Sequence, residues 1–265
     1  MTLPCATMPA DKPAKKERLD QLLVIRGLAE TRTRAQALIL AGQVRVEGLA
    51  GVKAGQAVPG DADITVLQPE PFVGRGGKKL AGALDAFAID PAGRVCLDAG
   101  ASTGGFSDCL LQRSAAHVYA VDVGYGQLDT KVASDPRVTV MDRTNVRHLT
   151  PEGLAESDGP ATLPELIVGD LSFISLTLVL PALAGLLAPG GEMVLLVKPQ
   201  FEVGKGQVGK GGIVRDPGLR AQAVEKVIDA AARAGLVCTG QAESSITGTK
   251  GNVEFLIHLI KPAET

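Results

Sequence analysis

One segment of this 265-residue chain constrains its fold more than any other: residues 94–106, with the sequence RVCLDAGASTGGF. It predicts a short buried strand over 95–97 that ends in Asp98, followed by a glycine-rich turn and a helix over 107–112. Glycine permits such a tight turn and lets a ligand approach the main chain closely. The residues of the turn that we expect to bind this ligand are Gly100, Ser102, Thr103, Gly104, Gly105 and Phe106.

A second acidic residue, Asp122, follows the next predicted strand, over 118–121. An acid at this offset from such a turn can accept hydrogen bonds from the two ribose hydroxyls of a nucleotide-like cofactor. Asp142, with Asn145 nearby, follows the third strand, over 138–141, where we expect the adenine edge of the same cofactor. The alternative for Asp142 is an acid that only caps the end of a strand.

The glycine pattern separates two kinds of cofactor. Dinucleotide-binding turns have the pattern G-x-G-x-x-G, whereas this turn has D-x-G-x-x-x-G-G, with the acid on the strand itself. A carboxylate beside the turn would repel a pyrophosphate, but it suits a cofactor with a cationic amino-acid part. The pattern therefore favours S-adenosylmethionine, and the alternative is a glycine turn with a purely structural role.

Strands and helices alternate after this turn. Further strands are predicted over 166–168 and 193–197, with a long apolar helix between them. A helix over 219–234 then leads to strands over 236–244 and 252–260, which a Gly-Thr-Lys-Gly turn separates. The alternation predicts an α/β fold with a mostly parallel sheet covered on both faces, and the last two strands predict a closing antiparallel hairpin.

Charge and composition indicate a smaller domain in front of this sheet. Residues 1–80 contain 12 Lys and Arg against 8 Asp and Glu, whereas the remainder contains 15 against 21. A basic front end on an acidic body indicates contact with a polyanion. We expect a disordered extension over 1–14, a small α+β domain over 15–67, a linker over 68–74 containing two prolines, and a large domain over 75–265.

The cysteines and the apolar segments exclude several classes of protein. Four scattered cysteines without a C-x-x-C pair predict neither a disulfide framework nor a zinc site, so we expect no metal. The N-terminus has no long apolar core of a secretory signal. The most apolar later segment, over 176–188, contains a proline and is too short to span a bilayer. We therefore expect a cytoplasmic protein without a membrane partner, and nothing indicates an obligate protein partner.

The small domain has the pattern of an RNA-binding module. Residues 18–27 and 31–42 predict two helices that stop at glycines, and strands follow over 44–48 and 64–67. The words RLDxxL, TRTRAQ and ILAGQVRVxG resemble the S-four-type RNA-binding domain. Arg18, Arg32 and Arg34 lie at the starts of the two helices, where guanidinium groups can bind phosphates. The alternative is that each is only a solvated helix residue.

Ionisable residues follow or interrupt apolar strands of the large domain. Asp170 and Lys198 come directly after such strands, and Glu254 interrupts the apolar run of the last strand. Because burying a charge without a partner is costly, each of them predicts a site, and we expect Glu254 to pair with Lys198. Lys79 completes the set. The alternative is a structural salt bridge between neighbouring strands.

These four residues match in order the Lys-Asp-Lys-Glu tetrad of ribose 2′-O-methyltransferases. The surrounding words RGGKKL, VGDLSFISL, LVKPQFE and GNVEF are closer still, and from about Lys15 to the end the chain resembles the TlyA family. That resemblance implies an FtsJ-like, Rossmann-like class I methyltransferase domain that uses S-adenosylmethionine. It also implies methylation of cytidines in 16S and 23S ribosomal RNA, although members are often labelled haemolysins. Either Lys78 or Lys79 fits the first position, and the family spacing favours Lys79.

The resemblance implies a role for each tetrad residue. A ribose 2′-hydroxyl is a very weak acid, so its attack on a sulfonium methyl requires that its proton be drawn off. Lys198 would be the base or hydroxyl activator, Asp170 and Glu254 would hold the lysines, and Lys79 would contact the nucleotide. In-line placement of the hydroxyl against the methyl group would supply much of the rate.

A glycine- and lysine-rich loop follows Lys198, and it could close on RNA. Its basic residues are Lys205, Lys210 and Arg215. The alternative is a mobile surface loop without a function. A Walker motif is excluded, because the sequence has no G-x-x-x-x-G-K-[ST] segment between a strand and a helix.

Two other functions remain open at this point. A ribosome-associated RNA-binding protein with an inactive methyltransferase-like domain would be expected to lack part of the tetrad, which is complete here. A membrane-active haemolysin would be expected to have a spanning segment or a basic amphipathic helix, and the sequence predicts neither.

Overall fold

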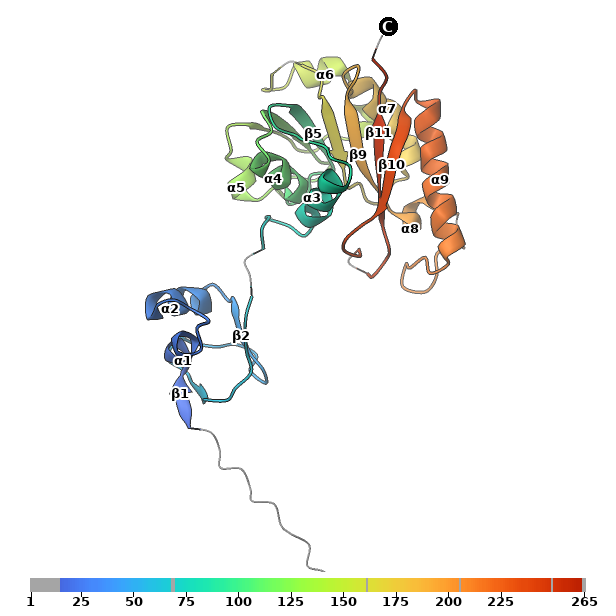
Figure 1. The fold of residues 1–265 in the computed structure, drawn as a ribbon. Helices are drawn as coiled ribbons and strands as arrows, with labels where there is room; N and C mark the ends of the chain where they lie inside the picture. Colours follow the sequence, from blue (N-terminus) through green and yellow to red (C-terminus); the bar gives the residue numbers. More distant parts are fainter. Residues whose placement is uncertain (1–14, 68–69, 161, 205, 249, 264–265) are drawn as a thin grey trace, which may run out of the picture. The chain divides into compact units, whose positions relative to one another are not determined.

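The computed structural model describes residues 15–67, 70–160, 162–204, 206–248 and 250–263. The chain divides into two compact units, residues 1–69 and residues 70–265 (Figure 1). The predicted extension over 1–14 and part of the predicted linker, residues 68–69, lie outside the described residues.

The first unit consists of two helices packed on short strand pairs. Strand β1 pairs with β3 and β2 pairs with β4, both antiparallel. Helix α2 begins where predicted, because the Thr31 hydroxyl accepts a hydrogen bond from the Arg34 N–H at 3.1 Å. The pair β1–β3 was not predicted from the sequence. The elements are β1 (Lys16–Arg18), α1 (Leu19–Ile25), α2 (Arg32–Leu40), β2 (Val44–Val46), β3 (Ala57–Pro59) and β4 (Ile64–Val66).

The second unit is built on one seven-stranded sheet of order β10-β11-β9-β8-β5-β6-β7. Strands β7, β6, β5, β8 and β9 are parallel neighbours, and β11 lies antiparallel between β9 and β10. The α/β prediction and the closing hairpin are therefore confirmed. The strands are β5 (Val95–Ala99), β6 (His117–Val121), β7 (Val138–Met141), β8 (Leu166–Gly169), β9 (Glu192–Val197), β10 (Val237–Glu243) and β11 (Phe255–Ile260).

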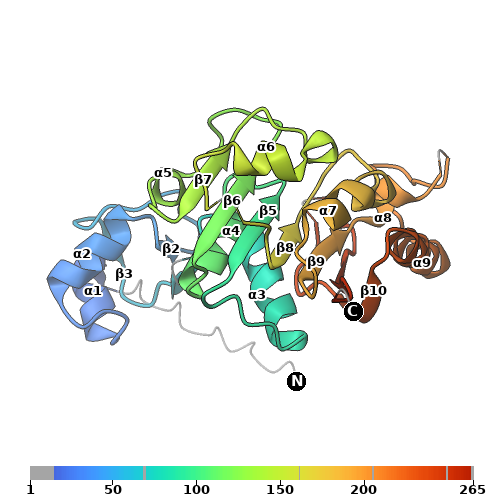
Figure 2. The same ribbon diagram turned by 90° about the horizontal axis from the view of Figure 1, so that it is seen from above.

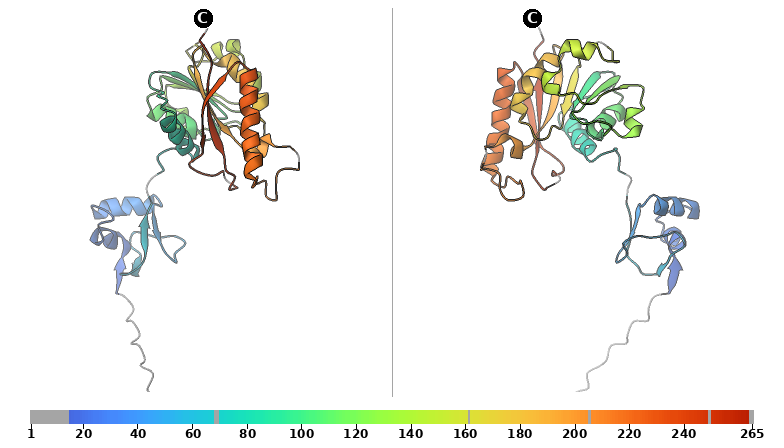
Figure 3. Two further views of the ribbon diagram at one scale, coloured as in Figure 1. Left: turned by 45° about the vertical axis from the view of Figure 1, so that its right-hand side comes forward. Right: turned by 180° about the vertical axis from the view of Figure 1, so that it is seen from behind.

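Helices cover both faces of this sheet, as the ribbon seen from above shows (Figure 2). Alternate residues of β5 point to opposite faces. Cys96 packs in the core under α3 (Gly76–Ala86) and α4 (Gly105–Gln112), whereas Leu97 packs in the core under α7 (Leu180–Leu186) and α9 (Pro217–Arg233). Helix α9 lies beside the closing hairpin (Figure 3). The smaller helices are α5 (Thr130–Ala133), η1 (Val146–His148), α6 (Pro151–Ala155), η2 (Leu176–Leu178) and α8 (Pro199–Glu202).

The apolar helix predicted between β8 and β9 differs from the structure. The long helix expected between β8 and β9 is instead the 3-10 turn η2 followed by the seven-residue helix α7. Pro181 explains the break, because it lacks an N–H and is tolerated only in the first turn of a helix. Helix α3 begins at Gly76, and the preceding loop is held by a hydrogen bond from the Val73 N–H to Asp108 Oδ2 at 2.9 Å.

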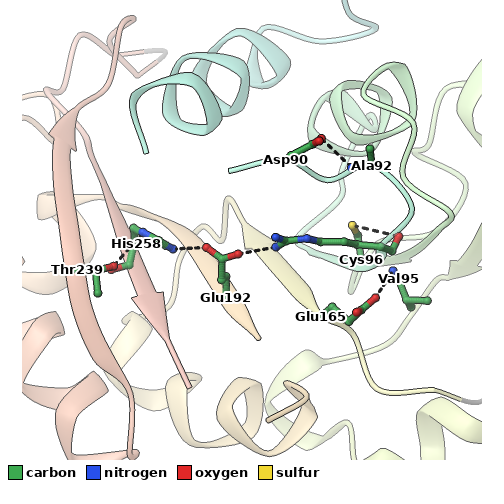
Figure 4. Close-up of polar contacts among 9 residues, drawn as sticks. Asp90, Ala92, Val95, Cys96, Glu165, Glu192, Thr239 and His258 are labelled. Carbon is green, nitrogen blue, oxygen red and sulfur yellow. Dashed lines mark hydrogen bonds and ion pairs between the residues drawn. The ribbon is translucent and has the colours of Figure 1, made fainter. Parts of the chain in front are cut away.

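Polar contacts tie the sheet together at the amino ends of its parallel strands (Figure 4). Glu192, the first residue of β9, accepts a hydrogen bond from Arg94 at 2.6 Å and pairs with His258 of β11 at 2.8 Å. Burial would raise the pKa of Glu192, but the bonds from Arg94 and His258 outweigh it and lower that pKa. This end of the sheet is therefore fixed by structural contacts, which leaves the opposite, carboxyl end for a ligand.

Candidate active site

The four predicted catalytic residues lie at the carboxyl end of the parallel strands. Asp170 follows β8, Lys198 follows β9, Glu254 directly precedes β11, and Lys79 lies on α3. All four line one cavity of about 240 Å³, together with Ser172 and the glycine turn after β5. The fold thus brings together residues that are up to 175 positions apart in the sequence.

Glu254 pairs with Lys79, not with Lys198 as expected from the sequence. Lys79 Nζ lies 2.5 Å from Glu254 Oε2, and the two side chains are only 8% and 3% exposed. Leu256, two residues after Glu254, packs in the core under α3, so Glu254 points to the same face of the sheet. The structure also separates the two candidate lysines, because Lys78 is half-exposed and pairs with Glu70 at 2.6 Å.

Lys198 has two partners on the loop after β8. Its Nζ lies 2.6 Å from Asp170 Oδ1. Its hydrogen bonds, however, point to Ser172 Oγ at 2.6 Å and to the main-chain oxygen of Asp170 at 3.4 Å. Asp170 Oδ1 consequently receives no well-directed hydrogen bond from the described residues. This oxygen faces Lys198 with capacity for a further donor.

The glycine turn has the backbone that its sequence predicts. Gly100 and Gly104 have φ angles of +84° and +91°, in the left-handed region that favours glycine. A Cβ atom on Gly104 would lie 2.8 Å from the end of the Leu128 side chain, which would have to move. Of the turn residues predicted to bind a cofactor, those that line the 240 Å³ cavity are Gly100, Ser102, Thr103, Gly105 and Phe106.

Asp98 is completely buried beneath this turn. Its Oδ2 accepts hydrogen bonds from the N–H and the hydroxyl of Ser107, at 2.9 and 2.7 Å, whereas Oδ1 has no partner among the described residues. Burial, together with the nearby carboxylates of Asp170 and Asp122, raises the pKa of Asp98 to about 7, although the Ser107 hydrogen bonds oppose this shift. A cationic ligand group would stabilise the ionised form.

A second cavity, of about 540 Å³, adjoins the first and contains the other predicted cofactor residues Asp122 and Asn145. Asp122 accepts hydrogen bonds from the Ser102 and Gly124 N–H groups, at 2.9 and 2.7 Å, which hold its carboxylate at the wall of the cavity. Asp142 is different, because its carboxylate accepts from the Gly126 N–H and does not line this cavity.

The arginines predicted to bind RNA are organised by a residue that the sequence analysis did not single out. Asp20, whose side chain is 0% exposed, accepts hydrogen bonds from Arg18 at 3.0 and 3.1 Å and from Arg32 at 2.9 Å. The bond from Arg18, helped by those from Gln36 and Arg32, overcomes burial and holds the pKa of Asp20 far below its usual value. Arg34 lies in the first turn of α2 and has no ion pair among the described residues.

The basic loop after α8 is anchored to the closing hairpin. Asn252, a buried residue, accepts a hydrogen bond from the Val214 N–H at 3.0 Å and donates one to the Gly212 carbonyl at 2.8 Å. Lys210 and Arg215 are exposed in this loop, and Lys205 lies outside the described residues.

Three side chains beside the tetrad were missed by the sequence analysis. A third cavity, of about 310 Å³, shares Ser172, Lys198 and Glu254 with the first and is also lined by Phe173, Gln200 and Phe201. Phe173 is 92% exposed and has a φ of +66°, which is rare for a bulky residue. The sequence feature that could have indicated these residues is their place in the segments VGDLSF and KPQF, a few positions after Asp170 and Lys198.

Comparison with known proteins gives consistent matches over both units. The sequence model of the FtsJ-like methyltransferase family matches residues 72–261, and that of the S4 domain matches residues 17–49. A Mycobacterium tuberculosis protein named 16S/23S rRNA (cytidine-2′-O)-methyltransferase TlyA is 52% identical over 248 residues, which covers 93% of this chain and 90% of that protein.

Two further relatives carry the haemolysin label. Hemolysin A of Brachyspira hyodysenteriae is 39% identical, over 92% of this chain and 99% of the relative. A solved structure from Streptococcus thermophilus, described as a candidate hemolysin, is 41% identical with a TM-score of 0.70, over 94% of this chain and 89% of that one. Among the described residues, however, we find no helix long and apolar enough to cross a membrane.

The raised pKa of Asp98 predicts how stability depends on pH. This carboxyl ionises near pH 4 in the unfolded chain and near pH 7 in the folded chain. The free energy of unfolding therefore decreases as pH rises through that interval. Asp98→Asn stays neutral and should escape this loss. We expect denaturant titrations to show the stability of wild type falling by a few kcal/mol relative to the variant between about pH 4 and about pH 7. Parallel stability curves for the two proteins would contradict this.

Proposed function

The chain belongs to the FtsJ-like methyltransferase family and, within it, to the TlyA family; from this premise we propose that it transfers a methyl group from S-adenosylmethionine to the ribose 2′-hydroxyl of cytidine in 16S and 23S ribosomal RNA. The observation that carries the proposal is the single cavity in which two lysines and two carboxylates meet the glycine turn. A binding module without catalysis would not require two ion pairs facing one cavity.

The residues of the turn fit S-adenosylmethionine. Asp98 Oδ1 is a buried oxygen without a partner among the described residues, and a cationic amino group would supply the missing charge. Asp122 retains acceptor capacity for ribose hydroxyls beside its two main-chain bonds, because an ionised carboxylate can accept about four hydrogen bonds. When bound, this cofactor supplies an electrophilic methyl group on a sulfonium centre.

Lys198 is best placed to act on the ribose hydroxyl. Asp170 and Ser172 fix its Nζ at the wall of the cavity, so the amine in its neutral form can accept the hydroxyl proton as the oxygen attacks. Lys79 and Glu254 line the same cavity, where they can orient the nucleotide. Holding the hydroxyl in one position contributes to the rate, because a bimolecular step then becomes effectively unimolecular.

The first unit supports an RNA substrate. Asp20 fixes the guanidinium groups of Arg18 and Arg32 while leaving both about half exposed, at 45% and 51%. A guanidinium already held in place loses less freedom when it binds a phosphate. The arginines at the starts of α1 and α2 would therefore bind the RNA backbone, and ribosomal RNA or a ribosomal subunit in the cytoplasm would be the partner.

Replacing Lys198 separates catalysis from structure. If Lys198 is the base, Lys198→Ala should lower methyl transfer at least about 100-fold, and adding Asp170→Ala should cost little more, because residues that act as a unit are strongly non-additive. If the ion pair of Lys198 with Asp170 is only structural, Lys198→Ala should cost about 3–5 kcal/mol of stability and spare turnover in folded protein.

Melting temperature and RNA methylation are measured on the same preparations, with Lys78→Ala as a control that keeps the cavity. Full turnover by folded Lys198→Ala protein refutes the mechanism.

The arginine set predicts a strong dependence of RNA binding on salt. Replacing Arg18, Arg32 and Arg34 by Ala should weaken binding and reduce the slope of log affinity against log salt by roughly 0.7–0.9 for each phosphate that the protein no longer neutralises. A matched variant removes the same charge elsewhere in the unit, by replacing Lys15, Arg45 and Lys53 with Ala. Titrations of full-length protein with ribosomal RNA fragments, with circular dichroism as a check of folding, should show the smaller effect for this control. Equal effects would mean that net charge alone attracts RNA.

A further inference from the structure

Gln200 is one of the polar side chains that line the third cavity, beside the tetrad. It lies on α8, two residues after Lys198, and it lines the 310 Å³ cavity together with Phe173 and Phe201. The two phenylalanine rings are 5.4 Å apart between centroids and tilted by 49°. No residue of the proposed methyl-transfer step needs this amide, so its position in the cavity requires another explanation.

The carbonyl oxygen of this amide is unsatisfied. Gln200 Oε1 has less than 1 Å² of exposed surface and no hydrogen-bond partner among the described residues. Water cannot reach so small an exposed area, and a buried acceptor without a donor costs free energy. Rotation about the last side-chain bond of glutamine is soft, so the amide can turn toward a ligand that offers a donor. The oxygen is covered in this structure, so it reaches a ligand in the cavity only when the amide turns.

The base of the target nucleotide is the part of the substrate that reaches this cavity. The base is attached to the carbon next to the one that bears the 2′-hydroxyl, so a hydroxyl at Lys198 places the base in a neighbouring space. The 540 Å³ cavity beyond Asp122 is assigned to the cofactor, which leaves the cavity of Phe173 and Phe201. Enzymes that act on single nucleotides read an extruded base through aromatic contacts and hydrogen bonds to its Watson–Crick edge.

We propose that Gln200 is a specificity-determining residue that reads the Watson–Crick edge of the target cytosine. Its Oε1 accepts a hydrogen bond from the exocyclic amino group, and its Nε2 donates to the ring nitrogen N3. Uracil reverses both groups, with an oxygen at position 4 and an N–H at position 3, so an amide held in the orientation that pairs with cytosine places acceptor against acceptor and donor against donor. This inference rests on the proposed function and names the group that selects its substrate.

Base discrimination is measured by combining a protein change with an RNA change. Gln200→Met keeps the length of the side chain but removes both polar groups, and Gln222→Met makes the same change on the exposed surface of α9. The full-length proteins are assayed with RNA that carries cytidine, uridine or 2-pyrimidinone ribonucleoside, which lacks the amino group, at the target position. The kcat/KM ratio between cytidine and each analogue is the readout.

For wild type and Gln222→Met we expect a preference for cytidine over both analogues, and for Gln200→Met we expect that preference to fall roughly tenfold. The melting temperature of Gln200→Met should be unchanged or higher, because the substitution removes an unsatisfied buried acceptor.

An unchanged preference for cytidine in Gln200→Met overturns the inference. If that variant does not fold, wild type decides the question, because equal kcat/KM for cytidine and 2-pyrimidinone overturns the inference as well. Failure of wild type to methylate any of the RNAs would instead overturn the proposed function.

Discussion

The pairing of buried charges at the carboxyl end of the sheet is the constraint on which the rest of the second unit depends. Lys79 and Glu254 are both almost fully buried, and removing either one would leave the other without its ion-pair partner, which is strongly destabilising. Their contact requires α3 to pack on the sheet and β11 to insert antiparallel between β9 and β10. Lys198 and Asp170 repeat the constraint on neighbouring parallel strands. Folding and the assembly of the site are thus one event.

Two of the four buried side-chain oxygens without a hydrogen-bond partner among the described residues belong to residues near this charged centre. Asp98 Oδ1 lies beneath the glycine turn, and Gln200 Oε1 belongs to a side chain that lines the 310 Å³ cavity. Protein interiors rarely leave such atoms without partners, and the exceptions concentrate where a ligand completes the site. The proposed cofactor would satisfy the first oxygen and the proposed target base the second, so that the ribose hydroxyl between them lies at Lys198.

The sequence predicts the strands and the members of the site better than it predicts their contacts. The strand over 138–141 has the predicted ends, because its apolar run is bounded by polar residues, and the TlyA resemblance is confirmed by the relatives. The predicted pairing of Glu254 with Lys198 was wrong, because the sequence does not show which face of β11 meets α3. The roles of Asp20 and Ser172 could not be predicted either, since each depends on side chains brought together only by folding.

Mass spectrometry with an isotopically labelled cofactor tests the central claim most directly. The purified protein is incubated with ribosomal RNA from a strain that lacks it and with S-adenosylmethionine that carries a trideuterated methyl group. The RNA is then digested to nucleosides. The account predicts the heavy methyl group in 2′-O-methylcytidine and in no other nucleoside. A heavy methyl group on a base or on another ribose, or none at all from folded protein that binds the cofactor, would contradict it.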